Sequence, residues 1–182
     1  MLEVEVKVRG AHDAVRRRLD ELDAESLGTV VQRDTYYDAP HRDFAATDEA
    51  LRLRRESTPD EEHGETRVTY KGPLVDDTSK SRVEHETGVA DGETMDAILR
   101  ELGFSPAAVV EKRRERFAYE GYTVTLDDVT DVGAFVEVER EVPESELASV
   151  REGAYAVVRD LGLDPDEGIR TSYLGMLLDE SE

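Results

Sequence analysis

Short segments of the chain place glutamate and basic side chains at alternate positions, the spacing of one face of a β-strand. Near the beginning of the sequence, Glu3, Glu5 and Lys7 alternate with valines. Paired glutamates supply the hard oxygen ligands that Mg²⁺ and Mn²⁺ prefer, and lysine and arginine bind phosphate oxygens. The pattern therefore predicts metal-assisted chemistry on a phosphorylated anion.

The same alternation recurs on seven segments with strand character, and we call the residues on their charged faces the polar-face set. It comprises Glu3, Glu5 and Lys7; Arg52 and Arg54; Arg67, Thr69 and Lys71; Arg82, Glu84 and Glu86; Lys112, Arg114 and Arg116; Thr125 and Asp127; and Glu137 and Glu139. One interpretation is an open sheet with a wet face, whose cross-strand ion pairs contribute about 0.2–1 kcal/mol each. We favour an internal cavity, because a solvent-facing surface of so acidic a chain should not be rich in cations.

Composition limits the other possibilities. The 182 residues carry 44 acidic and 23 basic side chains, a net charge of −21, and no cysteine. Disulfides, thiolate metal sites and cysteine nucleophiles are thereby excluded, and binding of nucleic acid or an anionic membrane to the outer surface is disfavoured. No leader or membrane-spanning run is evident, so we expect a single domain over residues 1–182 in the cytoplasm. The acidic excess favours a halophilic source over a merely GC-rich genome.

Periodicity and turn signals predict the elements that must position these residues. Strands are expected at 2–9, 28–38, 50–57, 66–72, 80–90, 108–119, 122–127 and 134–141. Helices are expected at 12–25, 93–102, 144–161 and 172–179, with one helical turn before residue 50 and a loop containing Pro73, Asp76 and Asp77. Short connections make most strand pairs antiparallel, and a sheet of eight strands can close into a barrel. The predicted fold class is α+β, a closed eight-stranded antiparallel β-barrel with helices packed outside.

The Glu-x-Glu-x-Lys segment at Glu3, Glu5 and Lys7 resembles the hallmark of the CYTH superfamily. These triphosphate tunnel metalloenzymes include class IV adenylyl cyclases, thiamine triphosphatases and inorganic tripolyphosphatases. Further motifs follow in family order: Asp34-Thr-Tyr-Tyr-Asp38, Leu51-Arg-Leu-Arg54, Tyr70-Lys71-Gly-Pro73, Arg82-Val-Glu84-His-Glu86, Glu111-Lys112-Arg-Arg114, Leu126-Asp127, Gly133-Ala-Phe-Val-Glu137-Val-Glu139 and Ser172-Tyr173. Together they cover essentially the whole chain.

The resemblance implies a tunnel in which basic residues hold a triphosphate and acidic residues hold a divalent metal, Mg²⁺ or Mn²⁺. The implied metal ligands are Glu3, Glu5, Glu137 and Glu139, assisted by Glu84 or Glu86. The implied phosphate-binding residues are Lys7, Arg52, Arg54, Lys71, Arg82, Lys112 and Arg114, and those with catalytic roles are Glu3, Glu5, Lys7 and Lys71. Asp127 matches a polar tunnel position whose role is left open.

The segment from Tyr36 to Arg55 looks most like the class IV cyclase branch, including its archaeal members, and together with the acidic excess this likeness implies a haloarchaeal source. That likeness implies conversion of ATP to cyclic AMP and pyrophosphate. A triphosphatase acting on thiamine triphosphate, tripolyphosphate or a nucleoside triphosphate is the alternative, and a non-catalytic sensor of polyphosphate or nucleotide is a second one. The expected partner is a small-molecule triphosphate, with neither nucleic acid nor membrane, and a homodimer is left open.

Overall fold

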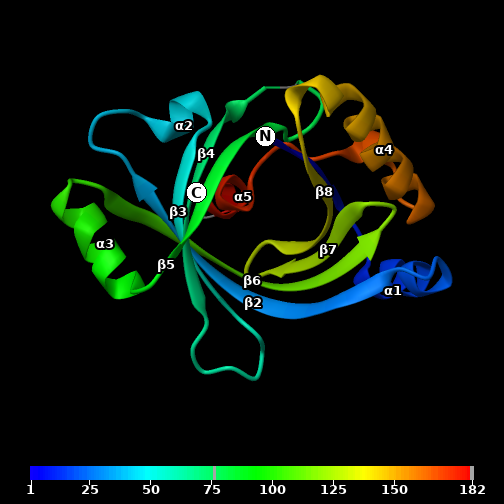
Figure 1. Ribbon diagram of the computed structural model, residues 1–182, viewed down its shortest axis with the longest axis horizontal. Helices are drawn as coiled ribbons and strands as arrows, with labels where there is room; N and C mark the ends of the chain where they lie inside the picture. Colours follow the sequence, from blue (N-terminus) through cyan, green and yellow to red (C-terminus); the bar gives the residue numbers. More distant parts are fainter. Residues whose placement is uncertain (76, 181–182) are drawn as a thin grey trace.

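Eight antiparallel strands close into one barrel in the computed structural model, which describes residues 1–75 and 77–180 (Figure 1). Around the barrel the strand order is β1-β5-β4-β3-β2-β6-β7-β8. Their bounds are β1 (Leu2–Arg9), β2 (Glu25–Asp38), β3 (Ala50–Ser57), β4 (Glu65–Leu74), β5 (Arg82–Val89), β6 (Ser105–Tyr119), β7 (Tyr122–Val129) and β8 (Gly133–Val142). The predicted fold class is confirmed.

The helices lie around and over the barrel. They are α1 (His12–Glu21), α2 (Phe44–Thr47), α3 (Gly92–Glu101), α4 (Leu147–Asp160) and α5 (Tyr173–Glu180), with 3₁₀ turns at Glu144–Glu146 and Pro165–Glu167. In the view of Figure 1, α5 lies in the middle of the ring of strands, whereas α1, α3 and α4 lie outside it. Among the described residues, no helix combines the length and the apolar character needed to cross a membrane.

Several sequence-based boundaries were off by two or three residues, including the starts of β2 (expected at 28), β5 (expected at 80) and β6 (expected at 108). Two other differences have a clear local cause. The first helix was expected to reach residue 25 but ends at Glu21, because Asp23 turns into the left-handed region (φ 55°) and the Ala24 N–H caps the carbonyl of Leu19. Pro73 was expected in a loop but belongs to β4, at a register shift against β5 where a missing N–H is tolerated. Asp76, expected in the same loop, lies outside the described residues.

The apolar faces of the strands point outward, and the main core lies between the barrel wall and the helices α1 and α4. Val4, Val6 and Val8 of β1 pack there with Val157 and Val158 of α4, and all five are at most 4% exposed. Burial of such a side chain contributes about 1.5–3 kcal/mol. Because the side chains of a strand alternate, fixing the valines outside fixes Glu3, Glu5 and Lys7 inside.

The barrel has one thin seam, between β1 and β5. β1 pairs with β8 along all eight of its residues, but with β5 only at Leu2–Val83 and Glu3–Arg82. The segment that connects β4 to β5 completes the wall, since the Lys80 N–H donates to the carbonyl of Glu5 (2.9 Å). At this seam Lys80, a residue of the connecting segment, therefore lies beside β1, whose charged face points into the barrel.

Candidate active site

The barrel encloses a cavity of about 820 Å³, and the polar-face set converges on it. The lining includes every glutamate and every basic residue of that set: Glu3, Glu5, Lys7, Arg52, Arg54, Arg67, Lys71, Arg82, Glu84, Glu86, Lys112, Arg114, Arg116, Glu137 and Glu139. The interpretation as an open wet sheet is therefore excluded. Charges that are far apart in the sequence face one enclosed space.

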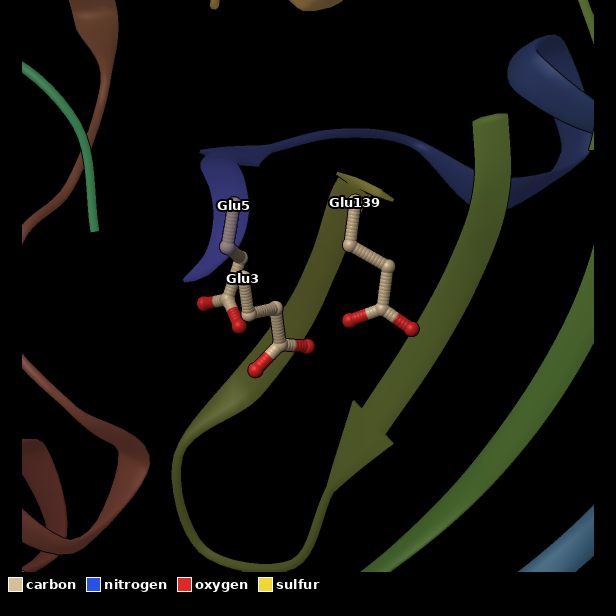
Figure 2. A group of neighbouring side chains, drawn as sticks. All are labelled: Glu3, Glu5 and Glu139. Carbon is tan, nitrogen blue, oxygen red and sulfur yellow. The ribbon is translucent and has the colours of Figure 1, made fainter. Parts of the chain in front are cut away.

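Three carboxylates on two neighbouring strands form an acidic cluster: Glu3 and Glu5 of β1 and Glu139 of β8. Glu5 and Glu139 are register partners in the antiparallel pair, and Glu3 lies two residues along the same face. One carboxylate oxygen from each residue lies within 4.8 Å of the others. Figure 2 shows the three side chains directed into a common space.

Burial and mutual repulsion leave this cluster electrostatically unbalanced. Burial raises the pKa of Glu3 well above its usual 4.5, with Glu139 and Glu84 adding to the effect against the pull of Lys71. Burial and the neighbouring carboxylates likewise raise the pKa of Glu139. Glu5 is also buried, but the ammonium groups of Lys80, Lys71 and Lys7 outweigh that burial and lower its pKa. Two of the three groups thus resist ionisation without further positive charge.

The acidic cluster fits a hard divalent cation. Its three donors are carboxylate oxygens, the ligands that Mg²⁺ and Mn²⁺ prefer, and its geometry requires no rearrangement of the strands. Glu5 is 6% exposed, and its Oε1 is buried without a hydrogen-bond partner among the described residues. A cation at this place would supply the missing partner and relieve the repulsion.

The other glutamates of the site lie against cations. Glu137 contacts Arg114 (3.0 Å) and Lys7 (3.9 Å), and Glu84 contacts Lys71 (3.4 Å) and Arg52 (3.7 Å). Glu86 accepts from the hydroxyl of Thr69 (2.8 Å) and from Arg67 (3.1 Å). Glu84 lies close enough to Glu3 to raise the pKa of that residue, but among the described residues only Glu3, Glu5 and Glu139 each place an oxygen within 4.8 Å of the others. The assignment of Glu84, Glu86 and Glu137 as metal ligands stays a prediction.

A second group of charges, which we call the paired-charge layer, consists of Asp34, Arg54, Lys112, Arg114 and Asp127. Arg54 donates to both oxygens of Asp34 at 2.7 Å, and the Lys112 ammonium lies 3.2 Å from the same carboxylate. Arg114 grips Asp127 in the same bidentate way, at 2.7 and 2.6 Å. These are short, charge-assisted bonds that fix the guanidinium planes.

The paired-charge layer gives Asp127 a role that the sequence left open. Its carboxylate holds Arg114 and accepts from the hydroxyl of Tyr173 at the start of α5 (2.7 Å). Burial would raise the pKa of both aspartates, but Lys112 and Arg54 beside Asp34, and Arg114 beside Asp127, keep them lowered. Asp127 is fully buried and fixes the position of the Arg114 guanidinium; phosphate binding by Arg114 stays a prediction.

The remaining predicted cations are held by individual contacts. Arg82 donates to the carbonyls of Asp48 (2.9 Å) and Gly72 (3.2 Å), and Arg52 keeps a buried Nε without a hydrogen-bond partner among the described residues. The Lys7 ammonium donates to the carbonyl of Thr171 (3.0 Å) and lies 3.9 Å from the centre of the Tyr173 ring. Burial lowers the pKa of Lys7 and of Lys112 to about 7.

Several functional residues were missed at the sequence level. Asp34 was noted in a motif but given no role, although it shares strand parity with Gln32 and Tyr36, which also line the cavity. Lys80 was included in the strand expected at 80–90, where it shares parity with Arg82 and Glu84, but it was left out of the polar-face set; in the structure it precedes β5 and its ammonium lies 3.4 Å from Glu5 Oε1. Its parity with Arg82 and Glu84 and the scarcity of lysine in the chain were the signals available for Lys80.

Charged side chains of both signs inside a closed antiparallel barrel define a class of protein, one built to hold a highly charged ligand within a tunnel. Residues 1–173 match the CYTH domain family, and the chain belongs to that family. The expected family membership is therefore confirmed, while a haloarchaeal source stays a prediction.

Relatives cover nearly the whole chain. "Putative adenylate cyclase MJ0240" from Methanocaldococcus jannaschii is 36% identical over 176 residues, covering 96% of this chain and 97% of the relative. The PH1819 protein from Pyrococcus horikoshii OT3 has a solved structure that is 36% identical and superposes with a TM-score of 0.90, covering 98% and 99% of the two chains. A structure from Vibrio parahaemolyticus named as a putative adenylate cyclase is 25% identical, with a TM-score of 0.84 and 98% coverage of both chains.

Proposed function

We propose that this protein is a divalent-metal-dependent enzyme that converts ATP to cyclic AMP and pyrophosphate, with the triphosphate bound in the barrel. The observation that carries the proposal is the convergence of the polar-face cations and the acidic cluster on one cavity. A triphosphate carries several negative charges along a short chain, and a lining of this kind complements it. The cyclase label follows the name of the curated relative that is 36% identical.

The lining also has room for an organic group. Tyr36, Phe44 and Leu51 line the cavity, and Leu174 and Leu178 of α5 contribute further apolar surface. Aromatic and aliphatic side chains favour a flat base over additional phosphate charge. This favours a nucleotide over inorganic tripolyphosphate as the substrate.

The protein side chains would act by position and charge. Arg52, whose Nε has no hydrogen-bond partner among the described residues, and Lys71 would bind phosphate oxygens and stabilise the negative charge that builds up on the leaving pyrophosphate. Lys7 and Arg114, held by Thr171 and Asp127, would keep the chain of phosphates aligned. Mg²⁺ or Mn²⁺ bound by Glu3, Glu5 and Glu139 would supply Lewis-acid stabilisation of phosphate charge.

A product assay tests the proposal. The protein is incubated at high salt with ATP, thiamine triphosphate or tripolyphosphate, with Mg²⁺, Mn²⁺ or chelator, and cyclic AMP and pyrophosphate are separated from orthophosphate. We expect metal-dependent release of cyclic AMP and pyrophosphate from ATP, absent from a Glu3→Gln variant purified in parallel. Release of orthophosphate instead would make the protein a triphosphatase, and saturable binding without product would make it a sensor; either result overturns the cyclase assignment.

A further inference from the structure

The segment between β4 and β5 places a cation on the acidic cluster. The Lys80 N–H donates to the carbonyl of Glu5 (2.9 Å), and the ammonium of the same residue lies 3.4 Å from Glu5 Oε1. The Lys80 side chain is 11% exposed and lines the cavity. Lys80 is thus bonded to β1 through its backbone, and its flexible side chain directs the ammonium toward Glu5, a carboxylate suited to binding a metal.

The position of Lys80 is fixed by contacts on both sides of it. Val75 N–H donates to the carbonyl of Ser81 (2.8 Å), and the buried hydroxyls of Ser79 and Ser81 share a hydrogen bond (2.7 Å). Tyr155 of α4 donates to the carbonyl of Thr78 (3.2 Å). Because the backbone is anchored while the side chain has four rotatable bonds, the ammonium can move without the segment moving.

The contact between Lys80 and Glu5 is loose. Glu5 Oε1 is buried and makes no hydrogen bond within the described part of the chain, although the ammonium is close enough for an ion pair. The well-formed pairs of the same barrel are 2.6–2.7 Å long. Glu5 Oε1 therefore has a nearby positive charge but no directed bond, which is the situation of a carboxylate with an exchangeable counter-ion.

We propose that Lys80 is a tethered cation that competes with the divalent metal for Glu5. Without metal, its ammonium offsets part of the repulsion within the acidic cluster. When metal binds, the ammonium leaves Glu5 and turns into the cavity, where triphosphate oxygens offer a new counter-charge. Metal and triphosphate binding are coupled through this exchange, and the coupling is reciprocal. The inference rests on the proposed function in one respect, that the acidic cluster binds a divalent metal.

Manganese binding to the nucleotide-free protein tests the competition directly. Mn²⁺ affinity is measured by titration calorimetry and by the electron paramagnetic resonance signal of free Mn²⁺, for wild type, Lys80→Met and Lys80→Arg. We expect Lys80→Met to bind Mn²⁺ on the order of tenfold more tightly, a usual size for coupling between linked sites. Lys80→Arg keeps the charge and should stay near wild type. Arg18→Met, which removes an exposed cation from α1, is the matched control and should change little.

The coupling is tested by repeating the titration with the α,β-methylene analogue of ATP. The analogue should tighten Mn²⁺ binding more in wild type than in Lys80→Met, since the variant has no ammonium to release. Equal Mn²⁺ affinity in wild type and a folded Lys80→Met, judged by thermal melting, would overturn the role of Lys80 alone. No Mn²⁺ binding by any of the proteins would instead overturn the metal site and the proposed function with it.

Discussion

Asp34 and Asp127 face the interior of the same barrel as Glu3 and Glu139, yet their surroundings differ. Each aspartate is gripped by a guanidinium through two bonds of 2.6–2.7 Å, and its pKa is lowered. Within the described part of the chain, the acidic cluster has only looser ion pairs, with Lys80 at 3.4 Å and Lys71 at 3.9 Å, and the pKa of Glu3 and of Glu139 is raised.

The difference distinguishes residues that stabilise the barrel from residues that are available to bind a ligand. In the paired-charge layer the protein supplies its own counter-charges, so those residues hold one another and fix the orientation of the cations. In the acidic cluster the counter-charge is incomplete, and such an imbalance is typical of a site that receives a ligand. Substitutions in the two regions should therefore have opposite consequences, one for stability and the other for activity.

The largest expected effect is on turnover, from Glu3→Gln. Removing one carboxylate from the acidic cluster weakens divalent-metal binding and should reduce metal-dependent turnover by about 10³-fold or more. Folding should be preserved, because the change relieves repulsion between buried carboxylates. Turnover is measured across a magnesium titration, with Glu111→Gln at an exposed ion pair as the matched control. Rates equal to wild type at every magnesium concentration would remove Glu3 from the site.

Asp127→Asn should act on stability. It leaves the Arg114 guanidinium buried without its bidentate partner and weakens the bond from Tyr173, which should cost about 3 kcal/mol. Urea denaturation measures the loss. Asp13→Asn, at a side chain that is 94% exposed, should stay within about 0.5 kcal/mol of wild type. If both variants unfold at the same urea concentration, the paired-charge layer is not structural.

A smaller effect is expected from Lys71→Ala, next to the acidic cluster. Lys71 contacts Glu84 and Glu3 and lines the cavity, so its loss should weaken triphosphate binding by roughly 10–100-fold, about 1.4–2.8 kcal/mol. Adenosine monophosphate, with fewer phosphate charges, should lose much less. Titration calorimetry with both ligands checks this, and Arg67→Ala, at a half-exposed side chain, serves as a milder comparison. Equal losses for the two ligands would contradict phosphate binding by Lys71.

The smallest effect is the pH dependence of stability in chelator. The raised pKa of Glu3 means that the folded state binds its proton more tightly, so stability falls as pH rises above 4.5 through the folded pKa. Asp34, whose pKa is lowered, contributes stability that is lost only as pH falls below 3.8. The slope above pH 4.5 should not exceed about 1.4 kcal/mol per unit for one group. Glu3→Gln should reduce it, and an unchanged slope would locate the effect elsewhere.

The sequence predicted the barrel because its strands alternate strictly. In β1, Val4, Val6 and Val8 alternate with Glu3, Glu5 and Lys7. Only one register of this strand packs the valines against a helix and turns the charged side chains toward one another. The same parity brought the predicted glutamates and cations to one cavity. Periodicity is a property of the local chain, so it can be read without knowing the fold.

What the sequence did not predict depends on pairing between distant segments. Parity places Asp127 inside, but its bond to Tyr173 joins residues 46 positions apart and gives it a positioning role. Lys80 lies in a connecting segment, and its approach to Glu5 follows from the thin seam between β1 and β5. Which of several interior glutamates share one cation depends on side-chain directions that strand alternation does not specify.

Because twelve of the 23 basic residues line the cavity, the field around the molecule is that of its acidic exterior. We expect long polyanions such as nucleic acids to be repelled by this exterior before they approach the interior cations. A small anion crosses the acidic zone over a short distance, and salt shortens that distance further. We therefore expect the wall of the barrel to favour compact anions over anionic polymers, because it keeps the basic lining away from the outer surface.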